Sequence, residues 1–375
     1  MRSKPQPGGA SVDIRISVAG NVDSGKSTLI GVFTGTGKLD NGNGEARSQV
    51  FMHKHEMESG RTSAVSQQIM GFTSTGRVTN HKDIDLERSL TWAEIVREAA
   101  KVITFFDLAG HEKYLKTTVA GMIGPSPDYC MLMLGANMGV QRMTKEHLGL
   151  AVNLALPAFV VITKIDISPE HVKQQTLQVI TRILKSNAAG RKMPMVIKTD
   201  DDVVTAAREV GNKKMVPIFF VSNVTGEGIA MLKQFLNLLP SAPKWEKKLS
   251  KPAEFQIDES FHITGIGTVV SGTVTAGRIG VNDEMLFGPD SLGAFQRVGF
   301  KGIHNKRVPV ETAQAGQSCS FAVKKIKRSQ VRKGQLLIHP SVNPKSSWCE
   351  PPPGHSISQF PARIMSPKSP RDDAT

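Results

Sequence analysis

An eight-residue stretch near the amino terminus, GNVDSGKS from Gly20 to Ser27, matches the phosphate-binding pattern GxxxxGK[ST]. It lies between an apolar run that begins at Val12 and a segment of helix type, as this chemistry requires. Backbone N–H groups of such a loop and the positive end of the following helix surround phosphates. Lys26 would reach the β- and γ-phosphates, and the Ser27 hydroxyl would bind Mg²⁺. The motif predicts a nucleoside triphosphate site.

A second motif, DLAGH from Asp107 to His111, follows the apolar run KVITFF. An acidic residue at the carboxyl end of a strand beside a phosphate loop can hold Mg²⁺ through water, so Asp107 is a candidate metal residue. Gly110 supplies a backbone N–H that can reach the γ-phosphate. His111 is placed to orient the attacking water; by itself, a histidine after a glycine is more often an exposed loop residue. The two motifs together favour a catalytic role for His111.

Two further motifs are candidates for recognising the base of the nucleotide: TKID from Thr163 to Asp166, and SNVTGEG from Ser222. A carboxylate that accepts from two ring N–H groups separates guanine from adenine, and Asp166 is the candidate for this contact. Lys164 would lay its stem over the purine ring, and backbone N–H groups near Ser222 and Asn223 would meet the guanine oxygen. Alone, TKID would be an ordinary strand end with a solvated charge pair. Four motifs in order, each at the end of a predicted strand, predict a guanine nucleotide.

The nucleotide-binding candidates share one property, which is that they lie at or shortly after the ends of predicted strands. They are Gly20, Asn21, Val22, Asp23, Ser24, Gly25, Lys26, Ser27, Thr28, Thr163, Lys164, Asp166, Ser222, Asn223 and Val224. Within this set, Asp23 is expected either to order the loop or a cation, or to be a plain turn residue.

The first 240 residues alternate apolar runs with amphipathic segments, which is typical of βαβ units and a mostly parallel, doubly wound sheet. The runs are nearly all apolar, as expected for strands covered on both faces. Between Gly35 and Arg77 the sequence is polar and rich in glycine without a clear period, and we expect a long exposed loop. Strands are predicted from Val12, Lys101, Asp128, Phe159 and Val216, and helices at Lys26–Phe33, Thr144–Leu154, Pro169–Ser186 and Gly228–Leu239.

After a linker rich in Pro and Lys, the pattern changes to short β-branched segments with frequent glycine, which predicts an antiparallel β-barrel or sandwich. The last stretch is rich in Pro and Ser and is expected to be disordered or a remnant of a further domain. The expected organisation is a disordered segment 1–11, a nucleotide-binding domain 12–240, a linker 241–252, a barrel 253–341 and a tail 342–375.

The composition limits the class of protein. Of 375 residues, 39% are hydrophobic and 21% charged, which suits ordinary globular cores. The longest apolar stretch, at Leu154 to Thr163, is too short to span a bilayer, and the first residues lack a signal-peptide core. We therefore expect a cytoplasmic protein without a membrane segment. Three cysteines, Cys130, Cys319 and Cys349, form no metal-binding pattern.

The net charge of +14 bears on partners, because a basic surface attracts nucleic-acid phosphates. Between Lys244 and Trp348 the chain has 16 Lys and Arg against 8 Asp and Glu, so the barrel and its linker carry a net +8. The cluster KKIKRSQVRK, at Lys324 to Lys333, alternates with apolar residues as a strand would. It is either a basic stripe facing an RNA backbone or a strand edge protected by lysines.

These motifs, followed by FHITGIGTVVSGTVTAG, resemble the translational GTPases of the elongation factor Tu type, and in particular the GTP-binding protein 1 and 2 subfamily, which has stretches similar to HKHEMESGRTS and DLAGHEKYLKTTV. The resemblance covers about Val12 to Pro340. It implies that the loop around Thr62 is switch I, that Thr62 is a magnesium ligand in the GTP state, and that Asp107 to about Gly121 is switch II. It also implies GTP, GDP and Mg²⁺ as ligands, and ribosomal or transfer RNA, the ribosome or the mRNA-decay machinery as partners. Separately from the resemblance, we expect a monomer.

The sequence departs from the family pattern in three places. Thr163 stands where most GTPases have Asn, and a shorter side chain is expected to reach less far toward the purine and the phosphate loop. We also expect the family's third domain to be missing or reduced to QFPARI, and the amino-terminal extension to be absent. Besides a GTP-hydrolysing switch, two functions therefore remain open. One is a nucleotide-stabilised RNA or protein adaptor, and the other is an ATP-using P-loop enzyme.

Overall fold

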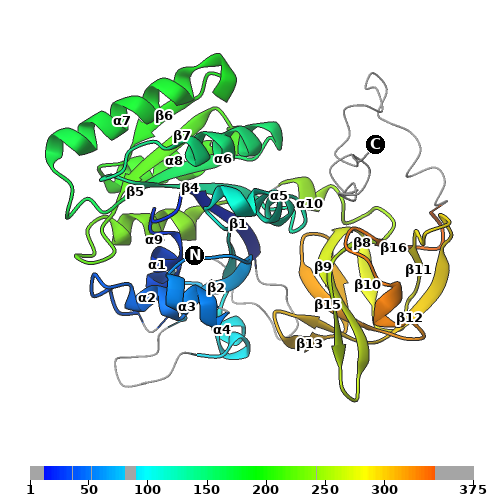
Figure 1. Ribbon diagram of the computed structural model, residues 1–375. Coiled ribbons are helices and arrows are strands. Elements are labelled where there is room, and N and C mark those ends of the chain that lie inside the picture. Colours follow the sequence, from blue (N-terminus) through cyan, green and yellow to red (C-terminus); the bar gives the residue numbers. More distant parts are fainter. Residues whose placement is uncertain (1–11, 36, 52, 81–89, 242, 343–375) are drawn as a thin grey trace, which may run out of the picture.

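A computed structural model describes residues 12–35, 37–51, 53–80, 90–241 and 243–342 (Figure 1). An α/β body built on a seven-stranded sheet comes first in the chain, and an antiparallel β-barrel follows. Some of the sequence predictions concern residues outside the described ones. These are the segment 1–11 and residues 343–375 of the expected tail, which include Cys349. Among the residues that are described, no helix is long and apolar enough to cross a membrane.

The sheet has the strand order β2-β3-β1-β4-β5-β7-β6. Its neighbours pair in parallel except for β2, which runs antiparallel to β3 at one edge. The five predicted strands are present, whereas β2 and β6 had no prediction. The strands are β1 (Val12–Gly20), β2 (Ser66–Phe72), β3 (Lys101–Asp107), β4 (Tyr129–Gly135), β5 (Ala158–Thr163), β6 (Met193–Val196) and β7 (Met215–Phe220).

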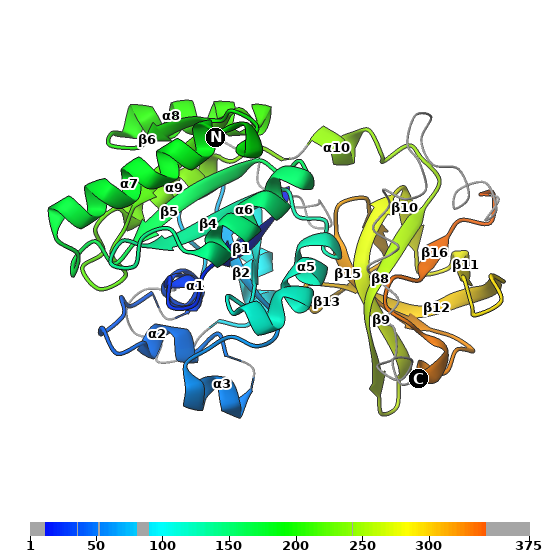
Figure 2. The same cartoon turned by 45° about the horizontal axis from the view of Figure 1, so that its top comes forward.

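Helices cover both faces of this sheet, which confirms the doubly wound architecture (Figure 2). One hydrophobic cluster joins the sheet to α1 (Lys26–Thr34), α8 (Asp200–Glu209) and α9 (Ile229–Leu238). A second cluster joins the other face to α5 (Leu115–Ile123), α6 (Arg142–Asn153) and α7 (Glu170–Lys185). The short helix α4 (Trp92–Glu98) packs on β2 at the edge.

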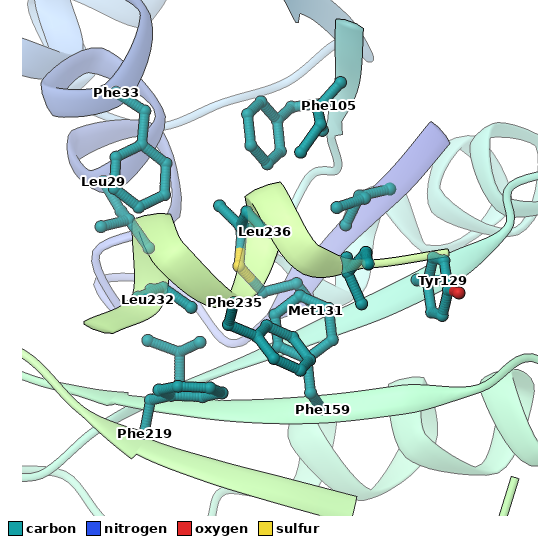
Figure 3. Close-up of a cluster of buried hydrophobic side chains, with 14 of the residues drawn as sticks. Leu29, Phe33, Phe105, Tyr129, Met131, Phe159, Phe219, Leu232, Phe235 and Leu236 are labelled. Carbon is teal, nitrogen blue, oxygen red and sulfur yellow. The ribbon is translucent and has the colours of Figure 1, made fainter. Parts of the chain in front are cut away.

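Aromatic rings fill the first cluster, beneath the helix that follows the phosphate loop (Figure 3). Phe235 of α9 lies 5.1 Å from the ring of Phe159 and 4.9 Å from that of Phe219, measured between centroids. On α1, Phe33 contacts Phe105 of β3 at 6.0 Å. Because tilted and edge-to-face ring pairs stabilise a core beyond their buried area, this cluster fixes α1 firmly against the sheet.

The segment between Gly35 and Arg77 differs from the predicted long loop. Its described part contains the short helices α2 (Glu45–Ser48) and α3 (Lys54–Ser59) and the edge strand β2. The side chain of Gln67 is exposed on β2, whereas Met70 is buried. A strand that begins with polar residues, two very short helices and several turn glycines leave no long period in the sequence, which is why the pattern predicts a loop.

In the second body, six strands close into a ring in the order β11-β16-β8-β9-β15-β12, because β11 also pairs with β12. This confirms the predicted barrel. Its interior is filled by Phe255, Phe300 and Phe321, with the Phe321 centroid 4.7 Å from that of Phe255 and 4.9 Å from that of Phe300. The elements are α10 (Pro243–Glu246), β8 (Glu254–Ile263), β9 (Gly267–Ala276), β10 (Arg278–Gly280), β11 (Glu284–Gly288), β12 (Gln296–Asn305), β13 (Val308–Val310), β14 (Thr312–Gln314), β15 (Ser318–Val323) and β16 (Leu336–Ile338).

The prediction that the basic cluster from Lys324 to Lys333 forms a strand is wrong. β15 ends at Val323, and the cluster continues as a bend and one 3₁₀ turn, η4 (Arg328–Gln330). Only Ile326 is fully buried within it. The left-handed backbone at Lys325, with φ of 63°, breaks the alternation that a strand needs. All six basic side chains of the cluster are exposed: Lys324, Lys325, Lys327, Arg328, Arg332 and Lys333.

Polar side chains at the amino-terminal end of β1 join the two bodies. The buried Arg15 guanidinium stacks on the ring of Trp245 at 4.5 Å and lies 3.4 Å from the Thr273 hydroxyl of the barrel. The Trp245 indole donates to Asp128, and Asp13 pairs with Lys306 of the barrel. The barrel therefore contacts one end of β1, while the phosphate loop follows the other end.

Candidate nucleotide site

The phosphate loop connects β1 to α1, as the sequence predicts, and its shape depends on two glycines. A Cβ at Gly20 would lie 2.4 Å from the Met133 carbonyl oxygen of β4, so only glycine allows this approach. Gly25 has a left-handed backbone with φ of 78° at the start of α1. The Lys26 ammonium donates to the carbonyls of Gly20 and Asn21 at 3.2 and 2.8 Å. Burial lowers the pKa of Lys26, and the nearby Asp107 and Asp23 carboxylates oppose that shift.

Three oxygens from distant parts of the chain meet beside this loop. The Ser27 hydroxyl donates to Asp107 Oδ2 at 2.6 Å and lies 2.8 Å from the Thr62 hydroxyl, which is 3.4 Å from the same carboxylate oxygen. The other Asp107 oxygen is buried and has no hydrogen-bond partner in the described structure. Burial raises the pKa of Asp107 to about 6. A buried carboxylate with a free oxygen beside two hydroxyls fits a hard cation such as Mg²⁺.

The segment after β3 approaches the loop closely at Gly110. A Cβ there would lie 2.6 Å from the Lys26 ammonium and 2.8 Å from the Gly20 carbonyl oxygen. The next residue, His111, is exposed, and its Nδ1 accepts from the Lys113 backbone N–H at 3.1 Å. A neutral imidazole that accepts at Nδ1 carries its proton on Nε2, which is then free to donate to a water molecule.

A buried carboxylate that the sequence analysis did not identify holds Thr62 in place. Glu56 of α3 accepts from the backbone N–H and hydroxyl of Ser63 at 2.7 and 2.9 Å, and from Ala64 N–H at 3.2 Å. Its second oxygen accepts from His53 N–H at 3.2 Å. Ser63 directly follows Thr62, so these hydrogen bonds fix the backbone next to Thr62. They thereby hold the Thr62 hydroxyl close to Ser27.

On the base side of the site, Thr163 does reach the phosphate loop, contrary to the expectation for a shorter side chain. Its buried hydroxyl lies 2.9 Å from the Ser24 carbonyl oxygen and 3.2 Å from the Leu134 carbonyl oxygen. The backbone at Lys164 is left-handed, with φ of 60°, and the Asp166 side chain beyond it is exposed. The Thr163 hydroxyl therefore connects the end of β5 to the phosphate loop, while the Asp166 side chain is exposed to solvent.

The loop after β7 is shaped by Ser222, whose hydroxyl accepts from the backbone N–H groups of Val224 and Thr225 at 3.2 and 3.0 Å. The buried Asn223 side chain lies close to Gly25, and its Oδ1 has no partner within the described residues. The Asn223 carbonyl accepts from Asp40 N–H at 2.9 Å. This last bond connects the base side of the site to the segment that precedes α2.

One small cavity collects the predicted phosphate and catalytic residues. It is lined by Val22, Asp23, Gly25, Lys26, Ser27, Thr28, Arg47, Gly60, Arg61, Thr62, Gly110 and His111. Two arginines in this set, Arg47 and Arg61, were not identified from the sequence, because a lone arginine in a polar segment has no distinctive spacing. The predicted base-binding residues, from Thr163 to Asp166 and from Ser222 to Val224, lie outside this lining.

His147 of α6 is a second residue that the sequence analysis missed. Its imidazole is buried, and Nδ1 accepts from the Gly20 backbone N–H at 3.1 Å. Burial, assisted by the Lys26 cation, lowers its pKa from 6.5 to about 4, so the ring is neutral when it supports the loop. The only sequence signal was a histidine on a buried helix face, and core histidines are common.

This pKa shift predicts how stability depends on pH. Unfolded chains bind a proton at this histidine below pH 6.5 while the folded protein does not, so stability falls as the pH drops toward 4. In His147→Asn an amide oxygen can accept from Gly20 without titrating. Urea denaturation measures the unfolding free energy of the variant and of wild type at each pH. The variant's value minus the wild-type value should rise by about 2 kcal/mol from about pH 7 to about pH 5. An unchanged difference between variant and wild type would contradict a neutral, buried His147.

The fold and this loop geometry define a P-loop nucleotide-binding protein. The family model for the elongation factor Tu GTP binding domain matches residues 13–241, and that for elongation factor Tu domain 2 matches residues 267–338. The chain therefore belongs to the family of proteins with an elongation factor Tu type GTP-binding domain.

Curated relatives share substantial identity with it. The chain is 52% identical over 337 residues to GTP-binding protein 1 of Xenopus laevis, covering 90% of this chain and 51% of that protein. It is 42% identical to human GTP-binding protein 2, covering 89% of this chain and 55% of that protein. The chain thus spans about half the length of these relatives.

Solved structures support the fold. A bacterial selenocysteine-specific elongation factor superposes with a TM-score of 0.63 at 22% identity, covering 88% of this chain and 45% of that one. The factor SelB of Methanococcus maripaludis in complex with the GTP analogue GPPNHP gives a TM-score of 0.60 at 21% identity, covering 88% of this chain and 56% of that one. At these identities the likeness concerns the fold.

Proposed function

We propose that this chain binds Mg²⁺ and GTP and hydrolyses GTP to GDP and phosphate as a molecular switch of the translation-factor type. The observation that carries the proposal is the meeting of Ser27, Thr62 and Asp107 within 2.6 to 3.4 Å of one another. Thr62 lies in a segment far from the other two in sequence, and this contact supports the assignment of that segment as switch I. Such a segment orders around the γ-phosphate and relaxes after hydrolysis.

In the proposed reaction each residue of the site has a distinct task. Backbone N–H groups from Asn21 to Thr28 and the Lys26 ammonium bind the phosphates, and Ser27, Thr62 and Asp107 would hold Mg²⁺. When bound, the metal neutralises charge on the β- and γ-phosphate oxygens. The Gly110 backbone N–H would bind the γ-phosphate, and His111 Nε2 would orient the attacking water. Hydrolysis without a partner is expected to be slow, because isolated switch GTPases lack part of the charge stabilisation.

Recognition of guanine is assigned to the exposed Asp166 carboxylate, with Lys164 against the purine ring and the backbone N–H groups of Ser222, Asn223 and Val224 near the guanine oxygen. Equilibrium binding of labelled GTP, ATP and xanthosine triphosphate tests this assignment. In Asp166→Asn the amide cannot accept from both ring N–H groups, so preference should move from GTP to xanthosine triphosphate by on the order of 10²-fold. A wild-type chain that binds ATP as tightly as GTP would instead support an ATP-using enzyme.

The proposed partner of the switch is RNA, on the ribosome or in the surveillance and turnover of messenger RNA. Support comes from the exposed basic residues of the barrel and from translation factors among the structural relatives. Interaction with the mRNA-decay machinery, a cytoplasmic location and a monomeric state belong to the same proposal.

A second candidate function is a nucleotide-stabilised adaptor in which hydrolysis is too slow to matter. It is favoured by the exposed basic side chains of the barrel, which could hold a partner without any hydrolysis. An adaptor should keep its partners when hydrolysis is abolished, whereas a switch should lose its cycle.

A further inference from the structure

Two cations of the site, Arg47 and Arg61, have no task in the reaction described so far. Arg47 of α2 lines the phosphate cavity together with Lys26, Thr62 and His111. Its side chain is half-buried and, within the described residues, makes no hydrogen bond or ion pair. Because withdrawing an unpaired guanidinium from water is costly, this position is best explained by an anionic ligand in the cavity.

The short helix that carries Arg47 is firmly anchored. The buried Asp40 carboxylate accepts from the backbone N–H groups of Gly42, Gly44 and Ala46 at 3.1, 3.2 and 2.9 Å. A Cβ at Gly31 would lie 2.0 Å from the Ala46 carbonyl oxygen, so α2 rests directly on α1, as both overall views show (Figures 1 and 2). The helix that carries Arg47 is therefore packed on α1, the helix that follows the phosphate loop.

Two glycines leave space for the guanidinium itself. A Cβ at Gly44 would lie 2.4 Å from Arg47 Nε, and a Cβ at Gly60 would lie 3.0 Å from Arg47 Nη2. Both glycines have left-handed backbones, with φ of 87° and 65°. The guanidinium thus lies against two stretches of backbone without side chains, which restricts where it can point.

This arrangement connects Arg47 to the conformation that senses the γ-phosphate. Gly60 is only two residues before Thr62, whose hydroxyl lies 2.8 Å from Ser27. In the proposed switch, Thr62 leaves this position after hydrolysis, and Gly60 moves with it. The guanidinium then loses its contact with one of the two backbone stretches that confine it. Arg47 is therefore held in place in the state that carries out the reaction.

We propose that Arg47 supplies, from within the same chain, positive charge that stabilises the transferring γ-phosphoryl group. This inference rests on the proposed GTPase function. The water oxygen forms a bond to the γ-phosphorus as the bond to the β–γ bridging oxygen breaks, and that electron pair stays on GDP. The proton of the water passes to solvent and phosphate. Arg47 exchanges no proton; its planar fork donates N–H groups to oxygens whose negative charge grows during transfer.

Arg61 is the competing cation, because it lines the same cavity. Its side chain is exposed and has no comparable support from glycines. A preorganised charge stabilises a transition state better than one that must first be ordered. The geometry therefore favours Arg47.

Single-turnover GTP hydrolysis measured on wild type, Arg47→Ala, Arg47→Lys and Arg61→Ala tests the inference. We expect Arg47→Ala to lower the rate by on the order of 10²-fold or more, and Arg47→Lys to recover part of it. GDP affinity should stay within about threefold of wild type, and binding of GDP with aluminium fluoride, which imitates the transferring phosphoryl group, should be lost in Arg47→Ala. Arg208→Ala, at an exposed position on α8, is the control for removing an arginine.

A glycine pair gives a matched structural control. Gly42 and Gly44 have nearly the same backbone, with φ of 85° and 87°, and both donate to Asp40. A Cβ at Gly42 meets nothing within 4 Å, whereas one at Gly44 meets the guanidinium. Gly44→Ala should therefore slow hydrolysis as Arg47→Ala does, and Gly42→Ala should not.

The outcomes separate this inference from the proposed function. A wild-type chain that binds GTP but never hydrolyses it would contradict both. Hydrolysis by wild type with Arg47→Ala within about threefold of it, or a loss confined to Arg61→Ala, would overturn the inference alone. The inference also fails if Arg47→Ala and Arg47→Lys weaken GDP and GTP binding equally at an unchanged hydrolysis rate, because the arginine would then only bind the ground state.

Discussion

Replacing His111 with alanine is expected to lower the single-turnover rate of GTP hydrolysis by on the order of 10² to 10⁴-fold, the usual contribution of a positioned proton donor or acceptor. The affinities for GTP and GDP should change little, because the exposed imidazole lines the cavity beside Gly110 and makes its hydrogen bond to Lys113 N–H, outside the phosphate loop. Rapid-quench hydrolysis with protein in excess over labelled GTP measures the rate.

Two variants control this experiment. His171→Ala removes another histidine, at the start of α7 and far from the phosphate loop in the chain, and should hydrolyse GTP as wild type does. His111→Gln keeps a side chain that can orient water and should retain part of the rate. Wild-type hydrolysis in His111→Ala would remove His111 from the mechanism. Partner binding that persists in the inactive variant would favour the adaptor function over the switch.

Gly110→Ala is expected to reduce hydrolysis by on the order of 10²-fold or more, because displacements near 1 Å are enough to cost that much at a reacting centre. The added methyl group would lie 2.6 Å from the Lys26 ammonium and 2.8 Å from the Asn21 carbonyl carbon, so the segment after β3 cannot approach the loop as it does here. GTP affinity should fall more than GDP affinity, since only GTP carries the phosphate that the Gly110 N–H would bind.

Equilibrium titrations with GDP and a non-hydrolysable GTP analogue, run beside the hydrolysis assay, check this result. Gly149→Ala on α6 is the matched control, because its Cβ would meet nothing within 4 Å and the same substitution there should be silent. Unchanged hydrolysis in Gly110→Ala would show that Gly110 and the loop separate in the reactive state.

Much of the site could be predicted from the sequence because its loops follow buried parallel strands. Apolar runs located β1, β3, β5 and β7, and the short motifs after them identified Lys26, Asp107 and His111. The predictions failed where a segment has no long period. The sequence predicts a loop where the edge strand β2 and its short helices lie. It also predicts a strand for the basic cluster after β15, which a left-handed residue interrupts.

For Thr163, the expected shorter reach toward the phosphate loop is wrong, whereas the expected shorter reach toward the purine stays a prediction. A comparison of side-chain lengths suggested a weakened connection to the phosphate loop, yet the hydroxyl lies 2.9 Å from the Ser24 carbonyl oxygen. How far a side chain must reach depends on the distance between β5 and the loop. That distance is set by the packing of the sheet, which no single motif contains.

The sequence by itself determined the chemistry that the strand ends offer, because a phosphate loop, a carboxylate after a strand and a base-recognition motif are local patterns of a few residues. Only the tertiary structure decided which distant residues join them. Arg47, Glu56 and His147 reach the site through helices whose positions depend on long-range packing and on glycines that leave space for close contact. Such contacts have no characteristic spacing pattern in the sequence, since residues far apart in sequence meet only once the sheet and its helices have assembled.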